Sequence, residues 1–251
     1  MKAVNDFFIP ENKIDTFLDG NYNQESVIFK ILNSVSRLTS KSIYVIDLYR
    51  KNFFYVSNNP LFLCGYSPDE VKEMGFRFYF KIVPEDEISL LLEINRAGFS
   101  FFDQIAIDER LKVSASFDFH IQNKEHLLLV NQKMTPIQLD RKGKIWLASC
   151  VVSLSHHQDA GNLEIHFEGK PDYRIYSQVD GKWKNQPGLE LKNREKEILQ
   201  LYDQGCIEEK IADKLCINKN TVKFHKRALF EKLGVNSMSA ALNAAYDYKL
   251  I

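Results

Sequence analysis

Six lysine or arginine side chains lie between Lys214 and Lys232, and Glu231 is the only acidic residue in this stretch. Clustered ammonium and guanidinium groups bind phosphate oxygens and hydrogen-bond to the edges of bases. Residues 1–188 do not share this charge, because they hold 22 basic and 24 acidic side chains. The formal net charge of zero over 251 residues therefore hides a basic segment near the C-terminal end.

Apolar residues around this basic segment predict two short helices that pack against each other. The inner sides of the two helices would be formed by Ile207, Ile211, Ala212 and Leu215, and by Val222, Leu229 and Leu233. Asn218 between the helices is a favourable N-cap residue. With the apolar side turned inward, the second helix carries its cations outward, where a major groove could receive them. These cations are Lys219, Lys223, Lys226 and Arg227.

A longer series of residue types keeps a fixed spacing from Leu191 to the end of the chain. The series contains Arg194-Glu195, Ile198-Leu199, Gly205, Ile211-Ala212, Leu215, Thr221-Val222-Lys223, His225, Lys232-Leu233 and Val235. With these residues the segment resembles the helix-turn-helix domain of LuxR-type (GerE-like) transcription regulators. A run of charge on a helix is by itself most often a solvated surface, and the resemblance favours a DNA interface instead.

The resemblance implies a four-helix domain that binds double-stranded DNA as a homodimer. Its third helix would enter the major groove, and its last helix, at about residues 237–248, would pack across the two-fold axis. The DNA-binding residues would be Lys223, Phe224 and Arg227, facing the groove, and Thr221 and Lys226, nearer to the DNA backbone, beside Lys219 at the start of the helix.

Three positions depart from the family's pattern. Ile207 replaces the usual Ser or Thr cap, Lys192 replaces a Thr near the domain start, and Lys210 replaces an acidic residue. A missing cap costs about 1 kcal/mol, which is too little to unfold the domain. Phe224 places an apolar ring toward the bases, where it could contact a thymine methyl group. His225 is expected to pack or to form a hydrogen bond inside the domain.

The residues before this domain show both helical and strand patterns. A helix is expected at about residues 22–38 and a hairpin at residues 43–48 and 53–57. Ser67-Pro68-Asp69-Glu70 predicts a capped short helix, and a further helix should run from Pro84 to Gly98 and continue over residues 99–111. Strands are expected at residues 114–121, 126–139, 144–154, 163–167 and 173–178.

Part of this front region resembles the PAS sensor family. The resemblance rests on Asn58-Asn59-Pro60, on Gly65-Tyr66-Ser67-Pro68-Asp69-Glu70 and on Val83-Pro84-Glu85-Asp86, and it extends from about Ser42 to Leu154. Val71 and Val83 replace a Glu and a His of the family's pattern. PAS domains bind a small molecule between helices and sheet, or pair with another protein, and the residues leave these two roles open.

No cofactor or metal is expected. Cys64 lies outside the sequence context that flavin photochemistry requires and is expected to be a small buried residue. The helix at residues 85–98 offers no haem-ligating histidine, and His156, His157 and His166 lack metal-ligand spacing and are expected to be exposed. Asp47 imitates a phosphorylated receiver aspartate, but its usual acidic and lysine partners have no counterparts. An acyl-homoserine-lactone pocket is disfavoured by the placement of the two tryptophans.

The expected fold class is an α+β PAS-like sensor domain followed by an all-α four-helix helix-turn-helix domain. We expect an N-terminal segment and helix at residues 1–41, the sensor domain at 42–178, a linker at 179–188 and the DNA-binding domain at 189–251. The four separated cysteines and the lack of a signal peptide or membrane segment indicate the cytoplasm.

These residues bear on three classes of function. A dimeric transcription regulator that senses a small molecule or a partner is the leading hypothesis. An enzyme is disfavoured, because no nucleophile, phosphate-loop or paired-carboxylate motif stands in a convincing context. An adaptor that binds ligands or proteins without specific DNA binding is the alternative.

Overall fold

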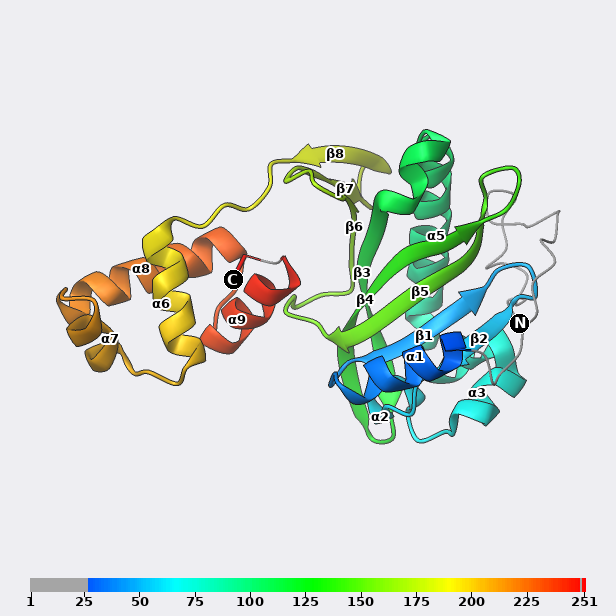
Figure 1. Ribbon diagram of the computed structural model, residues 1–251, viewed down its shortest axis with the longest axis horizontal. Helices are drawn as coiled ribbons and strands as arrows, with labels where there is room; N and C mark the ends of the chain where they lie inside the picture. The colour runs from blue at the N-terminus through cyan, green and yellow to red at the C-terminus, as the bar shows by residue number, and fades with distance from the viewer. Residues whose placement is uncertain (1–26, 249) are drawn as a thin grey trace. The chain divides into compact units, whose positions relative to one another are not determined.

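An eight-stranded antiparallel sheet forms the framework of the residues before Pro187 (Figure 1). The computed structural model describes residues 27–248 and 250–251, so the expected residues 1–26 of the N-terminal segment lie outside the described part. The strands follow the order β2-β1-β5-β4-β3-β6-β7-β8. Their bounds are β1 Ser42–Asp47, β2 Asn52–Val56, β3 Val113–Asn123, β4 His126–Leu139, β5 Ile145–Leu154, β6 Gly161–Phe167, β7 Tyr173–Ser177 and β8 Lys182–Gln186.

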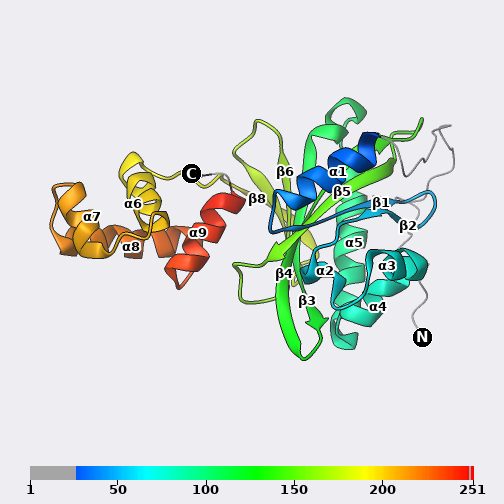
Figure 2. The ribbon, with the colours of Figure 1, turned by 60° about the horizontal axis from the view of Figure 1, so that its bottom comes forward.

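Helices cover both faces of this sheet. The connection from β2 to β3 consists of α2 Pro60–Leu63, α3 Pro68–Met74, η3 Gly75–Phe78, α4 Tyr79–Ile82, η4 Glu85–Glu87, α5 Ile88–Asp103 and η5 Ile107–Lys112. Figure 2 shows α5 running along one face with α3 and α4 beside it, and α1 (Val27–Arg37) lies on the opposite face. The expected order of a hairpin, helices and three long strands is therefore confirmed, and with it the α+β fold.

Local sequence signals fix where these elements begin. Ser67 caps α3, because its hydroxyl accepts a bond from the Glu70 amide and the Glu70 carboxylate accepts one from the Ser67 amide, which is a full capping box. Asp47 ends β1, where its carboxylate accepts bonds from the backbone amides of Tyr49 and Arg50. The side chain that imitates a receiver aspartate thus stabilises the hairpin turn.

Alternation along β1 divides the interior into two clusters. Tyr44 and Ile46 point toward the helices and join the main core, whereas Ile43 and Val45 point to the other face and pack under α1. Phe62 of α2 is almost fully buried and stacks on Tyr44 with a centroid separation of 4.4 Å. An aromatic core therefore joins the hairpin to the helices.

Two segments differ from the sequence-based expectation. Residues 182–186, expected in a linker, form β8 and pair with β7, because Gly181 at positive φ allows a tight turn and Trp183 packs on Phe101 and Tyr176. The helix expected to run to Leu111 ends at Asp103. Buried Arg110 explains that end, since its guanidinium donates to the backbone oxygens of residues 103, 105 and 143 and holds the segment after α5 as the short 3-10 helix η5 instead of a continuation of α5.

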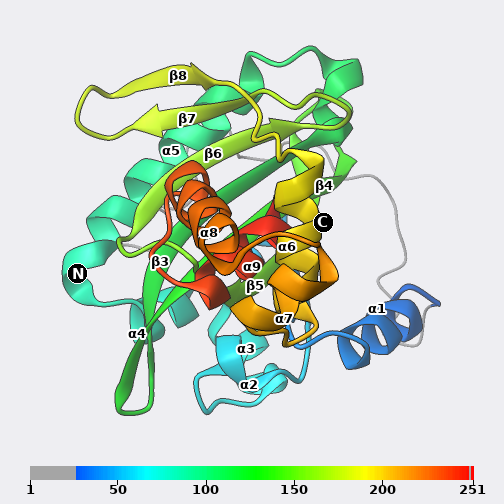
Figure 3. The ribbon, with the colours of Figure 1, turned by 90° about the vertical axis from the view of Figure 1, so that its left-hand side faces the viewer.

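The residues from Pro187 onward form a separate all-α unit (Figure 3). It consists of α6 Asn193–Asp203, α7 Glu208–Lys214, α8 Lys219–Leu233 and α9 Met238–Asp247. Ile198, Ile211, Val222 and Leu229 are fully buried in its core, which confirms the expected four-helix arrangement. Among the described residues, none of these or the preceding helices is long and apolar enough to span a membrane.

We expect Phe62→Ala to lower the free energy of unfolding by about 3 to 5 kcal/mol, because it opens a cavity in the aromatic core. Urea unfolding followed by circular dichroism measures this change. Phe224→Ala is the matched control, because the Phe224 side chain is 68% exposed and its removal opens no cavity. Equal losses in the two variants would contradict the packing described here.

Candidate nucleic-acid interface and apolar cavity

The turn between α7 and α8 is fixed by backbone and cap hydrogen bonds. The Asn218 carboxamide oxygen accepts bonds from the Thr221 amide at 2.8 Å and from the Thr221 hydroxyl at 3.0 Å, so the predicted N-cap is confirmed. The Ile217 amide donates to the Ala212 oxygen at 3.0 Å. Ile207 leaves the start of α7 without a side-chain cap, as its departure from the family's pattern implied. Thr221 therefore stabilises the start of α8 through its hydroxyl.

The outward side of α8 carries Lys223, Phe224 and Arg227. All three side chains are exposed, and they follow one another on one side of the helix because residues three and four apart share a side. The His225 ring meets Phe224 edge to face at 5.7 Å and is only partly buried, so its expected interior position is wrong. These three side chains form the surface that we call the outer face of α8.

Lys226 does not belong to that outer face. Its ammonium group lies 3.0 Å from the Glu208 carboxylate and 5.9 Å from the ring centroids of Tyr202 and Phe230. The expectation that Lys226 points outward is therefore wrong. Its position explains the difference, since it is four residues after Val222 and three before Leu229 and thus shares their inward side. Lys226 ties α8 to α6 and α7.

Two further cations of the basic segment are paired with acids from outside it. Lys219 forms an ion pair with Glu209 at the surface, and this pairing lowers the pKa of Glu209. Lys232 lies 2.8 Å from the Glu195 carboxylate and donates to the Glu190 backbone oxygen. Half of the six cations thus neutralise carboxylates of the same domain. Lys223 and Arg227 keep exposed charge with no ion pair among the described residues.

Glu195 is the internal anchor of this charge arrangement. Burial pushes the pKa of Glu195 upward, but the Lys232 ammonium group and the Lys192 backbone amide outweigh burial and hold that pKa below its ordinary value. Lys192, which replaces the family's Thr, cannot accept the hydrogen bond that a hydroxyl would, so only the Glu195 half of a capping box is present. The Glu195 carboxylate therefore links the start of α6 to the end of α8.

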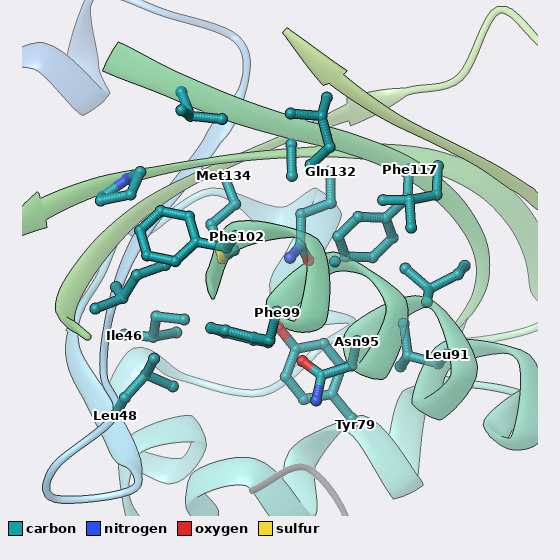
Figure 4. A pocket seen from close by; sticks show the side chains of 18 of the residues that line it. Ile46, Leu48, Tyr79, Leu91, Asn95, Phe99, Phe102, Phe117, Gln132 and Met134 are labelled. Carbon is teal, nitrogen blue, oxygen red and sulfur yellow. The ribbon is translucent and has the colours of Figure 1, made fainter. Parts of the chain in front are cut away.

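The N-terminal unit encloses an apolar cavity of about 80 Å³ between α5 and the sheet (Figure 4). Phe99 and Phe102 of α5 face Phe117 and Met134 of the sheet across it. The polar side chains on its lining are Tyr79, Asn95 and Gln132, and the described lining contains no charged residue. The cavity can therefore hold a small neutral molecule and offer it a few hydrogen bonds.

A buried hydrogen-bonded chain orients the polar part of this cavity. The Tyr44 hydroxyl donates to the Gln132 carboxamide oxygen at 2.5 Å and lies 2.6 Å from the Tyr79 hydroxyl. Burial and the neighbouring Cys150 raise the pKa of Tyr44 well above its ordinary value, so the phenol stays protonated. With its oxygen engaged, Gln132 retains its amide nitrogen as the donor that a bound molecule can use. The PAS resemblance indicated this region but none of these residues by number.

Cys64 and the three histidines of the N-terminal unit discussed above are buried or partly buried. Cys64 is buried, as expected, and burial raises the pKa of its thiol to about 12. The histidines expected to be exposed are not, since His156 is buried and His157 lies 2.6 Å from the fully buried Asp118 carboxylate. His166 lies 2.9 Å from Glu164 and stacks on Tyr173. The loop after β5 brings His157 to Asp118, whereas His166 and Glu164 pair within β6.

The family comparison concerns the C-terminal unit. Residues 190–245 match the GerE family model, described as bacterial regulatory proteins of the luxR family. This match confirms that α6 to α9 form a LuxR-family helix-turn-helix domain. The Fimbriae Z protein of Escherichia coli strain K12 is 39% identical over 61 residues, which are 24% of this chain. The chain spans 29% of the length of that protein.

Two solved structures that are similar to this chain differ in how much of it they cover. The response regulator ChrA of a heme-sensing two-component system is 42% identical over 26% of this chain and 33% of its own, with a TM-score of 0.25. The Vibrio cholera VqmA–ligand–DNA complex is 16% identical and covers 91% of this chain and 92% of its own, with a TM-score of 0.35.

We expect Lys232→Met to destabilise the C-terminal domain at neutral pH by about 1 to 2 kcal/mol, because it leaves a nearly buried carboxylate without its cation. The difference in unfolding free energy between this variant and the parent chain should shrink as the pH falls through the lowered pKa of Glu195. A protonated Glu195 is neutral and does not need the Lys232 ammonium group as a partner. Urea unfolding at several pH values measures this. Lys223→Met, on the outer face of the same helix, is the control and should change stability little. A pH-independent loss would contradict the role assigned to Glu195.

Proposed function

We propose that this chain, whose residues 190–245 form a LuxR-family domain, is a cytoplasmic transcription regulator that binds duplex DNA as a dimer and senses a small molecule in its N-terminal domain. The single observation that carries the DNA-binding part is the outer face of α8. Lys223, Phe224 and Arg227 project there from a helix whose other side is anchored in the core.

The six predicted DNA-binding residues take different parts in this proposal. Lys223 and Arg227 bind phosphates or base edges in the major groove, and Phe224 contacts a thymine methyl group. Because the Lys219 side chain is exposed, its ammonium group can leave the Glu209 carboxylate and pair with a DNA phosphate instead. Thr221 and Lys226 hold α8 in position through Asn218 and Glu208. A dimer would place two copies of α8 in successive major grooves, about 34 Å apart along the duplex.

The N-terminal cavity supports the sensing part of the proposal. Its lining is mostly apolar and contains no charged side chain, which favours a neutral molecule over an ion, because a buried charge without a partner is costly. Its small volume favours a compact molecule. Gln132, held by Tyr44, and Asn95 of α5 would fix the orientation of that molecule through hydrogen bonds. Mass spectrometry of the small molecules that co-purify with the chain identifies the occupant.

We expect the chain to enrich a specific sequence from a random library of DNA duplexes. On that sequence Lys223→Ala and Arg227→Ala should each weaken binding by about 1 to 3 kcal/mol, and the affinity of the parent chain should fall steeply with salt. Titrations at several salt concentrations measure both effects. Lys182→Ala removes an exposed lysine from β8 and is the control that should bind like the parent chain. Failure to enrich any sequence, or a binding affinity that does not change with salt, would contradict the DNA-binding proposal.

We expect Gly98→Leu to abolish ligand binding and to leave the fold intact. Gly98 lines the cavity from α5, and a Cβ atom added there meets nothing within 4 Å. The leucine side chain would occupy the space of the ligand, and replacing a helical glycine removes a cost of about 1 kcal/mol. Calorimetric titration with the co-purified molecule, together with thermal unfolding, tests this. Ser100→Leu, at an exposed position of the same helix, should bind normally. Normal binding by Gly98→Leu would place the ligand elsewhere.

A further inference from the structure

The hairpin of β7 and β8 is anchored on both walls of the apolar cavity. Strand β7 pairs with β6, whose Leu163 and Ile165 line the cavity. Strand β8 contacts the other wall, because the ring centroids of Trp183 and of Phe101 on α5 are 4.6 Å apart. Figure 3 shows β6, β7 and β8 side by side. A change in the separation of α5 and β6 must therefore move or strain the hairpin.

Further contacts attach the hairpin to α5 at a second point. Tyr176 of β7 lies directly opposite Trp183 of β8 in the strand register, and their ring centroids are 5.3 Å apart. The Tyr176 hydroxyl donates to the Glu93 carboxylate at 3.3 Å. Glu93 and Phe101 are about two helical turns apart on α5. The hairpin therefore follows the position of α5 along much of its length.

Different residues of α5 face the cavity and contact the hairpin. Gly98, Phe99 and Phe102 line the cavity, whereas neither Glu93 nor Phe101 belongs to its lining. A Cβ atom added at Gly98 meets nothing within 4 Å, so a bound molecule has room against this part of the helix. Because close-packed interiors have little space to absorb a displacement, a molecule that changes the seating of α5 on the sheet also acts on the hairpin.

The connection from this hairpin to the LuxR-family domain is short. Strand β8 ends at Gln186, and Leu189 already packs against the hydrophobic core of the C-terminal unit. Only Pro187 and Gly188 lie between these two residues, and an extended chain spans at most about 3.6 Å per residue. The proline ring also fixes one of the backbone angles of this connection. A displaced end of β8 therefore pulls on the start of the C-terminal unit.

We propose that the β7–β8 hairpin couples occupancy of the cavity to DNA binding, with Trp183 and Tyr176 as the positioning residues that carry the movement of α5 to the end of β8. This coupling rests on the proposed function, because it needs a cavity that takes up a molecule and a domain that binds DNA. It adds the element through which the two communicate. The hairpin follows Leu154, the end of the segment that resembles the PAS family, so that resemblance does not assign this role.

Hydrogen exchange of the full chain, followed by mass spectrometry without DNA, tests the connection from cavity to hairpin. Gly98→Leu is the probe, because its side chain fills the cavity, and the reference is the parent chain freed of small molecules by dialysis. The variant should slow amide exchange in β8 and at Gly188 about threefold or more, because the leucine adds packing between the two walls that anchor the hairpin. Ser100→Leu, at an exposed position of the same helix, should leave these rates unchanged. Rates that Gly98→Leu does not slow overturn the proposal.

Two variants that remove the contact with α5 test whether the hairpin rings carry this effect. Trp183→Ala removes the ring on β8, and Phe101→Ala removes its partner on α5 and leaves the hairpin sequence intact. In either background Gly98→Leu should no longer slow the exchange. A Trp183 ring that only stabilised β8 would instead keep the ratio between filled and empty cavity while all rates rise. Lys182→Ala, at the neighbouring exposed position, should keep the full ratio. A ratio that survives Trp183→Ala or Phe101→Ala contradicts the proposal.

Titration of the duplex that the parent chain enriches tests the connection from hairpin to DNA. Gly98→Leu should change the dissociation constant for this duplex about threefold or more, and in the Trp183→Ala background this ratio should fall to one. An unchanged dissociation constant in Gly98→Leu, or a ratio that Trp183→Ala leaves intact, defeats the proposed coupling while the DNA-binding proposal stands. A chain that shows the coupled exchange but enriches no duplex retains the connection between cavity and hairpin and loses the proposed function.

Discussion

The rotation of α8 about its own axis decides what the C-terminal domain can present to a partner. Burial of Val222 and Leu229 turns one side of this helix into the core, and the Asn218 cap fixes where the helix starts. Lys226 strengthens that choice, because its ammonium group pairs with Glu208 on α7 and lies over the rings of Tyr202 and Phe230. Lys223 and Arg227 face outward as a consequence of what the opposite side buries.

Strand β1 of the N-terminal domain likewise has two sides that pack against different partners. Residues of β1 alternate between the cavity and α1, since Ile46 lines the cavity and Ile43 and Val45 pack beneath Phe29. A molecule in the cavity and helix α1 would thus rest on opposite faces of one strand. Close-packed interiors transmit displacement from one face to the other, so cavity occupancy and the seating of α1 share a physical connection.

Much of the fold follows from local patterns, and much of the site does not. Strand β4 and the Ser67 capping box could be predicted because alternation, turn residues and cap chemistry act over a few positions. Lys226 was misplaced because charge suggested solvent, whereas its spacing from Val222 put it on the buried side. The partners of Lys226 and Lys232 are 18 and 37 residues away, and no local pattern reveals an ion pair across such a separation. The cavity likewise depends on side chains from several distant elements.

The internal ion pairs bear on the dimer that we propose. Glu208, Glu209 and Glu195 hold three of the six cations in the basic segment, so among the described residues only half of this segment's cations are free of an acid of the same domain. Because phosphate contacts supply most of the affinity that does not depend on sequence, a single domain should bind weakly. Two linked domains recover affinity by effective concentration, since the second binds as an intramolecular step once the first is bound. A contact between the N-terminal domains of two copies would supply that link before any DNA is bound.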